Sequence, residues 1–389
     1  MSRALNGGAD AAPAVLRDPS GAVNCLCRVV DGLVLAASDL ATLLDASGPA
    51  PVDWDYVAIN AANLTAAPQA TALAGVMELP PGTIARPGAP LDFAPIWSPW
   101  TYARQAAPVA DTELPALIET TVKDCVSAWA QTFSHVSLGV SGGLDSSVVA
   151  ACLAAGPIAV SSYTFATHDA DGDERRHARL LTQALGLSLH ECFYRLEDIN
   201  IDVSLAAHLP RPLSNYVAQS LTRETARLRE EQGVDAHFSG SGGDNIFCLL
   251  HSAAPLVDQV RAGTTPAALW RSVRDLSRLT TASALEIVRL ALIHGRDKRQ
   301  FRPAAPANPF LRLSGNPHLA HRFDHPWLQA PDDIPPGKVR HVALLALAEL
   351  GAGSDPARDL PPVILPLLAQ PLVEALPGDS GLEVVRRWR

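Results

Sequence analysis

Short β-like apolar runs alternate with helical patterns through the middle of this 389-residue chain, and this alternation constrains the fold most strongly. The β-like runs cover 135–140, 158–165 and 189–194, and a shorter one ends at Phe238. Strands that alternate with helices form parallel sheets whose two faces the helices cover. The sequence therefore predicts an α/β fold, with a parallel sheet between helical layers.

Helical patterns precede, separate and follow these runs. Helices are predicted near 145–155, 174–185 and 215–229, and the chain reads as helical from Pro255 onward. Another helix is predicted after Asp111, where apolar residues recur at i, i+3 and i+4 spacing. The residues of that apolar face are Leu114, Leu117, Ile118, Val122, Cys125, Val126 and Trp129.

The first hundred residues follow a different pattern, with short apolar runs split by Gly, Pro, Asp and Asn. Two such runs, Val23–Val30 and Leu33–Ala36, flank Asp31-Gly32, a dipeptide that is typical of a two-residue hairpin turn. Asp39 is expected to cap a short helix that follows the hairpin. This part of the chain therefore predicts a smaller, strand-rich unit.

A Pro-rich stretch, 87–108, reads as a linker between two domains. We therefore place the smaller N-terminal domain at 1–108 and the larger domain at 109–389. The core of the larger domain is expected at 130–250, with a helical remainder.

Composition limits the classes of function. The chain has 31 Lys and Arg against 40 Asp and Glu, a net charge of −9, which argues against a nucleic-acid partner. No apolar run reaches the length of about 18 residues that a membrane span needs, so no membrane partner is expected. The six cysteines show neither a disulfide framework nor paired zinc spacing. We expect a cytoplasmic protein.

The motif with the clearest chemistry is Ser-Gly-Gly-Leu-Asp-Ser-Ser, residues 141–147, between a predicted strand and a predicted helix. Its glycines let main-chain N–H groups approach an anion, and the helix N-terminus and serine hydroxyls add donors. The loop is therefore expected to bind phosphate. The binding residues we assign to it are Ser141, Gly142, Gly143, Leu144, Asp145, Ser146 and Ser147.

Asp145 would be out of place beside a bare phosphate. A magnesium ion between them removes the conflict, because Mg²⁺ takes a carboxylate together with phosphate oxygens. The kinase-type pattern G-x-x-x-x-G-K-[ST] does not occur in the sequence. The loop therefore predicts a Mg²⁺ ion between Asp145 and a bound phosphate.

The first loop resembles the pyrophosphate-loop motif of the N-type ATP pyrophosphatases, which cleave ATP between the α and β phosphates to adenylate a substrate. The resemblance therefore implies ATP, together with Mg²⁺, as the cofactors. A second Gly-rich loop, 238–247, resembles the second signature loop of asparagine synthetase and β-lactam synthetase. That resemblance implies that Asp244 is a second magnesium ligand and that Ser239 and Gly240 contact the nucleotide. Both aspartates are expected to be catalytic.

The string Gly242–Cys248 is more similar to lasso peptide cyclases, which are macrolactam synthetases. Asparagine synthetases usually have Glu at the position of Ser241 and an acidic residue at that of Asn245. The resemblance implies that a side-chain carboxylate of a precursor core peptide is joined to the amino terminus of the same peptide. It also implies a partner, a protease that removes the leader peptide. An asparagine synthase-like enzyme that uses free ammonia remains the alternative.

The resemblance has two departures. The N-terminal domain is similar to part of the family's glutaminase-like domain, but residue 2 is Ser where glutaminases need Cys, so no glutamine hydrolysis is expected. Relatives also place a catalytic Lys near the carboxyl end, and this chain has none after Lys338. Three interpretations stay open: Lys338 substitutes as a catalytic residue, the activity is reduced to that of a nucleotide- or peptide-binding remnant, or the chain is a truncated version of a longer enzyme.

Two other patterns are not expected to carry chemistry. Cys25 and Cys27 alternate with period two, so both thiols should share one strand face as buried small side chains. His318, His321 and His325 lack an acidic partner at zincin spacing, so we interpret them as surface residues.

Overall fold

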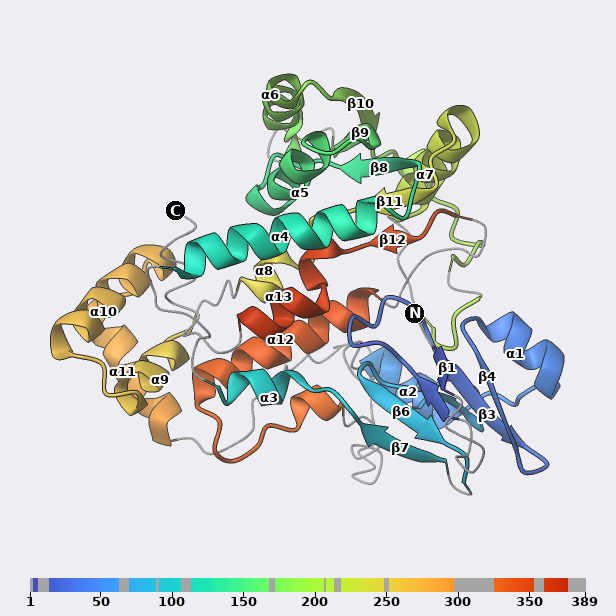
Figure 1. Cartoon of the computed structure of the whole chain (residues 1–389), viewed down its shortest axis with the longest axis horizontal. Helices are drawn as coiled ribbons and strands as arrows, with labels where there is room; N and C mark the ends of the chain where they lie inside the picture. The colour runs from blue at the N-terminus through green and yellow to red at the C-terminus, as the bar shows by residue number, and fades with distance from the viewer. Residues whose placement is uncertain are drawn as a thin grey trace.

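Three sheets and the helices around them make up the part of the chain that the structure describes (Figure 1). The structure is a computed structural model that describes residues 3–5, 14–62, 70–88, 91–105, 113–167, 172–205, 208–212, 218–247, 252–296, 325–352 and 360–376. No helix in these ranges has the length and apolar character that crossing a bilayer requires.

The largest sheet is five-stranded and entirely parallel, in the order β10-β9-β8-β11-β12. Its strands are β8 (His135–Gly139), β9 (Ala159–Ala166), β10 (Ser188–Phe193), β11 (Ala236–Phe238) and β12 (Val363–Ile364). The first four match the predicted runs to within two residues at their shared ends. The fifth was not predicted: β12 is only two residues long and is recognisable only through its pairing with β11.

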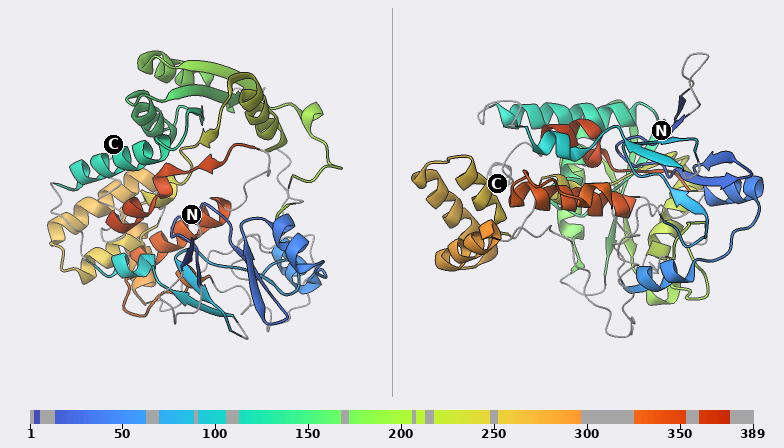
Figure 2. Two further views of the ribbon diagram at one scale, coloured as in Figure 1. Left: turned by 45° about the vertical axis from the view of Figure 1, so that its right-hand side comes forward. Right: turned by 90° about the horizontal axis from the view of Figure 1, so that it is seen from below.

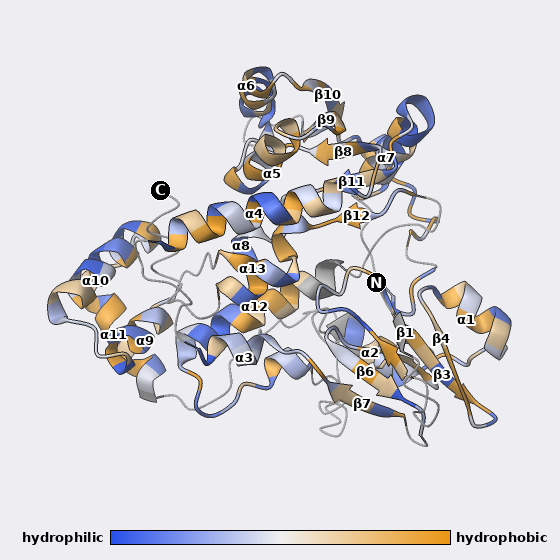
Figure 3. Ribbon diagram, in the orientation of Figure 1, coloured by the Kyte–Doolittle hydropathy of each residue, from blue (hydrophilic) through white to orange (hydrophobic). Residues whose placement is uncertain are grey.

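Helices cover both faces of this sheet, as the alternation predicted. On one face lie α4 (Leu114–Ala130), α5 (Leu144–Ala154) and α6 (Arg175–Leu185), and on the other α7 (Ala218–Gln232). In Figure 3, α5 is mostly hydrophobic and α7 mostly hydrophilic, so α5 is the more deeply embedded of the two. The expected α/β fold is therefore confirmed.

Alternate side chains of β8 point to the two opposite helical layers. Val136 and Leu138 lie fully buried in the main core together with α4 and α5. Ser137 points to the other face, where Tyr163 packs against Leu228 of α7. This period of two is that of a strand buried on both sides.

The helical remainder has two parts. Three helices, α9 (Ala254–Arg261), α10 (Pro266–Thr280) and α11 (Ala284–Arg296), share a small core and lie apart from the N-terminal sheets (Figure 2). By contrast, α12 (Pro336–Ala352) and α13 (Gln370–Ala375) pack into the main core. The C-terminal helices thus complete the core of the α/β unit.

The N-terminal region contains two antiparallel sheets. One is four-stranded, and its strands are β1 (Arg3–Leu5), β2 (Ala14–Leu16), β6 (Thr83–Arg86) and β7 (Asp92–Pro95). The other is three-stranded, and its strands are β3 (Leu26–Val30), β4 (Leu33–Ala37) and β5 (Val76–Glu78). Two helices accompany them, α1 (Leu40–Ser47) and α2 (Trp54–Ala62).

The predicted hairpin is confirmed. Val30 pairs with Leu33, which leaves a two-residue turn in which Asp31 has φ 50° and Gly32 has φ 78°. Both central residues of a type I′ turn need positive φ, and Asp-Gly supplies them. The Asp39 side chain accepts a hydrogen bond from the Thr42 N–H and so caps α1, as expected.

The prediction of a linker at 87–108 was wrong. Within it, β7 adds an edge strand to the four-stranded sheet, and α3 (Pro99–Ala103) follows directly. Trp100 of α3 is only 6% exposed and belongs to the main core. Proline was misleading here because edge strands and the first turn of a helix both tolerate it.

A short segment before α7 attaches the N-terminal sheets to the α/β unit. Arg211 forms an ion pair with Glu78, whose carboxylate also accepts a hydrogen bond of 3.0 Å from buried Arg17. The Asn60 side chain donates to the Pro212 carbonyl at 2.9 Å. Two guanidinium groups therefore neutralise one buried carboxylate where the two parts meet.

Candidate active site

The two Gly-rich loops follow neighbouring strands, β8 and β11. The sheet order reverses at this point, because β9 and β10 lie on one side of β8 whereas β11 and β12 lie on the other. Ligands of open α/β sheets bind beyond the carboxyl ends of strands at such a reversal. The topology therefore brings both predicted loops to one place.

The turn of the first loop depends on Gly142. Its φ is +80°, a conformation that residues with a side chain rarely adopt. A Cβ atom at this position would also overlap the Cβ of His177 on α6. Gly143 then serves as the N-cap of α5, so the free N–H groups of that helix begin inside the loop.

Serine hydroxyls hold the first loop together. The Ser141 hydroxyl accepts from the Gly143 N–H at 3.2 Å and lies 3.1 Å from the Ser146 hydroxyl. The Ser146 and Ser147 hydroxyls both donate to the Gly143 carbonyl, at 3.2 and 2.7 Å. The loop is thus preformed, with its hydrogen bonds supplied from within its own seven residues.

The second loop turns at Gly242, whose φ is +92°, and continues into the single helical turn α8 (Gly243–Ile246). Before that turn, the Ser239 hydroxyl accepts from the Ser241 N–H at 3.1 Å and lies 2.9 Å from the Ser241 hydroxyl. These bonds fix its first half, and Asp244 lies on α8 beyond them.

The two loops are in direct contact, and glycine is required on one side of it. A Cβ at Gly240 would lie 2.5 Å from the Ser146 nitrogen and 2.7 Å from the Asp145 carbonyl carbon. A Cβ at Gly243 would overlap the Asp145 carboxylate. The second loop therefore packs its bare main chain on the start of α5.

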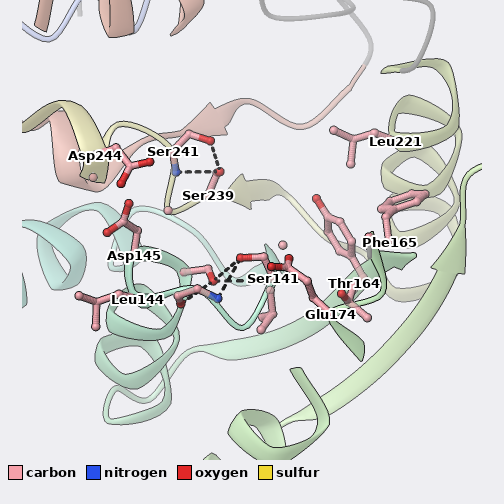
Figure 4. A pocket seen from close by; sticks show the side chains of 18 of the residues that line it. Ser141, Leu144, Asp145, Thr164, Phe165, Glu174, Leu221, Ser239, Ser241 and Asp244 are labelled. Carbon is pink, nitrogen blue, oxygen red and sulfur yellow. Dashed lines mark hydrogen bonds between the residues drawn. The ribbon is translucent and has the colours of Figure 1, made fainter. Parts of the chain in front are cut away.

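This contact places Asp145 and Asp244 opposite each other (Figure 4). Burial raises the pKa of Asp145, the nearby Asp244 carboxylate raises it further, and a backbone hydrogen bond from Asp244 opposes the shift. Two facing carboxylates, one of them half-buried, repel unless a cation lies between them. Hard oxygen ligands of this kind fit Mg²⁺, which commonly uses one or two carboxylates together with phosphate oxygens.

The loops line a cleft of about 770 Å³ with two chemically different ends. Serines and glycines of both loops form one end, and Phe165 and Leu221 lie at the other (Figure 4). Tyr194 stacks on Phe165 there. Three carboxylates line it, those of Asp145, Glu174 and Asp244, and no Lys or Arg does so among the described residues. A polyanion would therefore need metal charge or a cation from elsewhere.

His237 and Tyr163 form a buried pair in the wall of the cleft that the sequence analysis did not single out. Their rings stack, and the Tyr163 hydroxyl lies 2.7 Å from His237 Nε2. Burial lowers the pKa of His237 to about 4, so the imidazole is neutral at pH 7. The sequence could have indicated both residues, because they lie on predicted strands that lead towards the cleft.

Most of the predicted site residues come together. Those that line the cleft are Ser141, Gly143, Leu144, Asp145, Ser146, Ser239, Gly240 and Asp244. Gly142 and Ser147 are not in its wall. Gly142 makes the turn of the first loop, and the Ser147 hydroxyl donates a hydrogen bond within that loop.

The structure does not bring Lys338 into this cleft. Lys338 lies in the first turn of α12, where its ammonium donates to the carbonyls of Ala103 at 2.8 Å and Gln105 at 3.1 Å. Its main-chain N–H donates to Asp258. Both carbonyls belong to the end of α3 and the residues after it, so the Lys338 ammonium is engaged at a helix end.

The histidine interpretation needs one correction. His325 is 2% exposed, because its ring accepts a hydrogen bond from the Trp327 N–H and packs edge-on against the Trp327 ring. It is a buried cap and not a surface residue. His318 and His321 lie outside the described residues. Across the described ranges, no three His, Cys, Asp or Glu side chains gather as a metal site.

The cysteine prediction is confirmed. Cys25 is 2% exposed and Cys27 is fully buried in one small core cluster. The contact with Cys25 and burial both raise the pKa of the Cys27 thiol, so it stays protonated. These thiols pack as small apolar groups.

Loops rich in serine and glycine at adjacent parallel-strand ends define an α/β protein of the nucleotide-binding class. Residues 117–330, more than half of the chain, match the asparagine synthase family. The chain therefore belongs to the asparagine synthase family, whose members are ATP-dependent ligases that form amide bonds.

Comparison with solved structures finds similarity to the U34-tRNA thiolase NcsA from Methanococcus maripaludis with its 4Fe–4S cluster. The identity is 14% and the TM-score 0.24, over 53% of this chain and 72% of the thiolase. At that level of likeness, nothing about the thiolase's substrate or cluster transfers to this chain. Comparison with curated proteins gives no match.

Proposed function

We propose that this protein uses ATP to adenylate a carboxylate and then joins that carboxylate to an amine, releasing pyrophosphate and AMP. The observation that carries the proposal is the contact between the two loops, which sets Asp145 and Asp244 opposite each other in one cleft. Adenylation by displacement of pyrophosphate needs such a cradle for phosphates, together with charge neutralisation.

The two ends of the cleft suggest how ATP would lie. Main-chain N–H groups and hydroxyls of the loops would receive the phosphates, and the aromatic end around Phe165 would receive the adenine ring. Asp145 and Asp244 would hold Mg²⁺, which supplies neutralisation of phosphate charge when bound. With no Lys or Arg in the described cleft wall, these two carboxylates become essential to binding a polyanion.

The chemistry has two balanced steps. A carboxylate oxygen of the substrate forms a bond to the α-phosphorus as the bond to the bridging oxygen breaks, and pyrophosphate leaves. The amine nitrogen then bonds to the acyl carbon, the bond to the AMP oxygen breaks, and the amine loses a proton. Both steps depend mainly on holding the reactants in line, which the preformed loops can do.

We propose further that the substrate is a precursor core peptide and the product a macrolactam. The support is the sequence Gly-Gly-Asp-Asn-Ile-Phe-Cys, residues 242–248, which is similar to that of lasso peptide cyclases. Such a peptide carries its own amine, so no ammonia source is needed, and a leader-peptide protease would be the partner that delivers it. Aspartate with free ammonia is the alternative pair of substrates.

Asp145→Asn and Asp244→Asn test the metal and nucleotide assignment. Each should weaken Mg²⁺·ATP binding at least about tenfold by calorimetry, because it removes a charge that faces a polyanion. Asp124→Asn, at an exposed position on α4, makes the same chemical change away from the cleft and is the control. If the parent protein binds Mg²⁺·ATP and both cleft variants bind it equally well, the assignment is wrong.

Mass spectrometry separates the two substrate classes. Purified protein with Mg²⁺·ATP is offered either synthetic peptides with a free amino terminus and one Asp or Glu, or aspartate with ammonium chloride. The macrolactam proposal predicts a peptide product lighter by one water and AMP formed in equal amount. Asparagine formation without any cyclised peptide would overturn it in favour of the alternative.

A further inference from the structure

Asp244 lies on α8, a helix too short to be stable by itself. The helix α8 comprises four residues, Gly243–Ile246, and follows the left-handed turn at Gly242. A single turn closes few internal hydrogen bonds for the dihedral angles that it fixes, so it is unstable in isolation. Something outside the loop must therefore keep the Asp244 carboxylate in place.

Two hydrogen bonds between α8 and α12 keep the turn in place. The Asn245 side-chain amide donates to the Leu344 carbonyl at 2.8 Å. His341 Nε2 lies 2.9 Å from the Ile246 carbonyl, and because a carbonyl can only accept, Nε2 carries the hydrogen. His341 is 2% exposed and Ile246 fully buried, so water does not replace the bond between them.

The chemistry of both side chains is specific. A carboxylate in place of Asn245 could not donate to the Leu344 carbonyl and would place two acceptors against each other. An apolar residue in place of His341 would leave the Ile246 carbonyl buried without this donor. The bonds are made by the two residues that directly follow Asp244.

The helix α12 is itself anchored at its first turn. The main-chain N–H groups of Gly337 and Lys338 donate to the two carboxylate oxygens of Asp258 on α9, at 2.8 and 2.9 Å. The Lys338 ammonium binds the end of α3. A continuous set of polar contacts thus links α9 and α3 through α12 to the turn that carries Asp244.

We propose that Asn245 and His341 are positioning residues, which hold the Asp244 carboxylate opposite Asp145 so that the pair can bind a divalent cation with the nucleotide. This rests on the proposed function of the two loops. It assigns to α12 an indirect role in metal affinity, because none of the residues described in the cleft wall belongs to α12.

The variants Asn245→Asp and His341→Leu remove one donor each, and His341→Gln keeps an N–H donor. Binding of Mn²⁺ and of Mg²⁺ in the presence of ATP is measured by calorimetry, together with the melting temperature. We expect the Asp and Leu variants to bind the metal about tenfold more weakly, and His341→Gln to recover much of that loss.

Val122→Ala is the control, a truncation in the same core but on α4. It should lower the melting temperature while leaving metal affinity within about twofold of the parent. If the Asn245 and His341 variants behave like this control, losing only melting temperature, their role is merely structural and the inference is overturned. His341→Gln and Asn245→Asp decide the matter if His341→Leu does not fold.

The same measurement separates this inference from the proposed function. A parent protein that binds no Mg²⁺·ATP overturns both. A parent that binds it and loses affinity on Asp244→Asn, but not on Asn245→Asp or on either His341 change, overturns the positioning role alone.

Discussion

The two loops of the site resemble each other in composition but differ in what supports them. The first loop, 141–147, is held by hydroxyls of its own serines and opens directly into the three-turn helix α5. The second, 238–247, contains only the single turn α8 and depends on α12, about a hundred residues away in the sequence. One half of the site is therefore locally determined, and the other half is determined by the tertiary fold.

This difference decides what each loop tolerates. A loop with several overlapping internal hydrogen bonds loses only part of its support when one is removed. A turn that two hydrogen bonds tie to a distant helix loses much of its position when either bond is removed. The predictions below compare these two kinds of support.

The largest effect is expected where the loops meet. Gly240→Ala places a methyl group 2.5 to 2.8 Å from main-chain atoms of Asp145 and Ser146, which cannot rotate away. Overpacking against main chain should cost roughly 3 kcal/mol or more and push the loops apart. Calorimetry should show that Mg²⁺·ATP affinity falls by roughly 100-fold.

Gly263→Ala is the matched control, since this glycine also lies in a turn but a Cβ there meets nothing within 4 Å. It should change stability only through its positive φ, and nucleotide affinity not at all. Unchanged affinity in Gly240→Ala would show that the loop contact does not matter for binding.

The anchor of α12 should respond to pH. Burial raises the pKa of Asp258 from 3.8 to about 6, although the Gly337 and Lys338 N–H groups and the nearby Lys338 and Arg261 charges oppose the shift. The folded protein then binds more protons than the unfolded chain between about pH 4 and 6. The raised pKa of Asp258 therefore stabilises the folded protein fully below pH 4, and this stabilisation is lost as pH rises through about 6.

Asp258→Asn removes that proton uptake. The unfolding free energy of the parent minus that of the variant should therefore fall by about 2 to 3 kcal/mol between pH 4 and pH 7. Urea titrations at both pH values measure it, and other carboxylates cancel in the difference. A parent-minus-variant difference independent of pH would contradict the buried state of Asp258.

A smaller effect is expected within the first loop. Gly142→Ala forces a side chain into φ +80° and against His177, at a cost of about 2 kcal/mol in loop stability. Calorimetric Mg²⁺·ATP affinity should fall by roughly tenfold. Gly142→Ala with His177→Gly relieves the overlap but not the φ strain, so it should recover only part of the loss. Full recovery would show that the left-handed turn carries no cost.

Local structure could be predicted from the sequence. The hairpin at Asp31-Gly32, the cap at Asp39 and the loop 141–147 each depend on residues within a few positions of one another. The alternation of strands and helices then placed the second loop beside the first, because neighbouring parallel strands end at the same edge.

Features whose position depends on distant partners could not be predicted from the sequence. Strand β12 is too short to carry a periodic signal and exists through its pairing with β11. The stretch 87–108 looked like a linker because its prolines concealed an edge strand and a helix. The contacts of Lys338 with α3 and of His341 with α8 join segments that no local pattern connects.

The smallest effect is expected from Ser147→Ala. The Ser147 hydroxyl donates to the Gly143 carbonyl at 2.7 Å, but the Ser146 hydroxyl donates to the same carbonyl, and the helix α5 is unaffected. The Ser147 main-chain N–H donates to this carbonyl as well, at 3.2 Å. Losing one of these three bonds costs about 0.5 to 1 kcal/mol, and nucleotide affinity should fall less than about fivefold. Asn245→Asp, which also removes a single hydrogen-bond donor, should cost more because no second side chain donates to the same carbonyl in the described structure. If Ser147→Ala weakened Mg²⁺·ATP binding more than Asn245→Asp does, the locally supported loop would be the more fragile one, and the contrast between the two loops would be reversed.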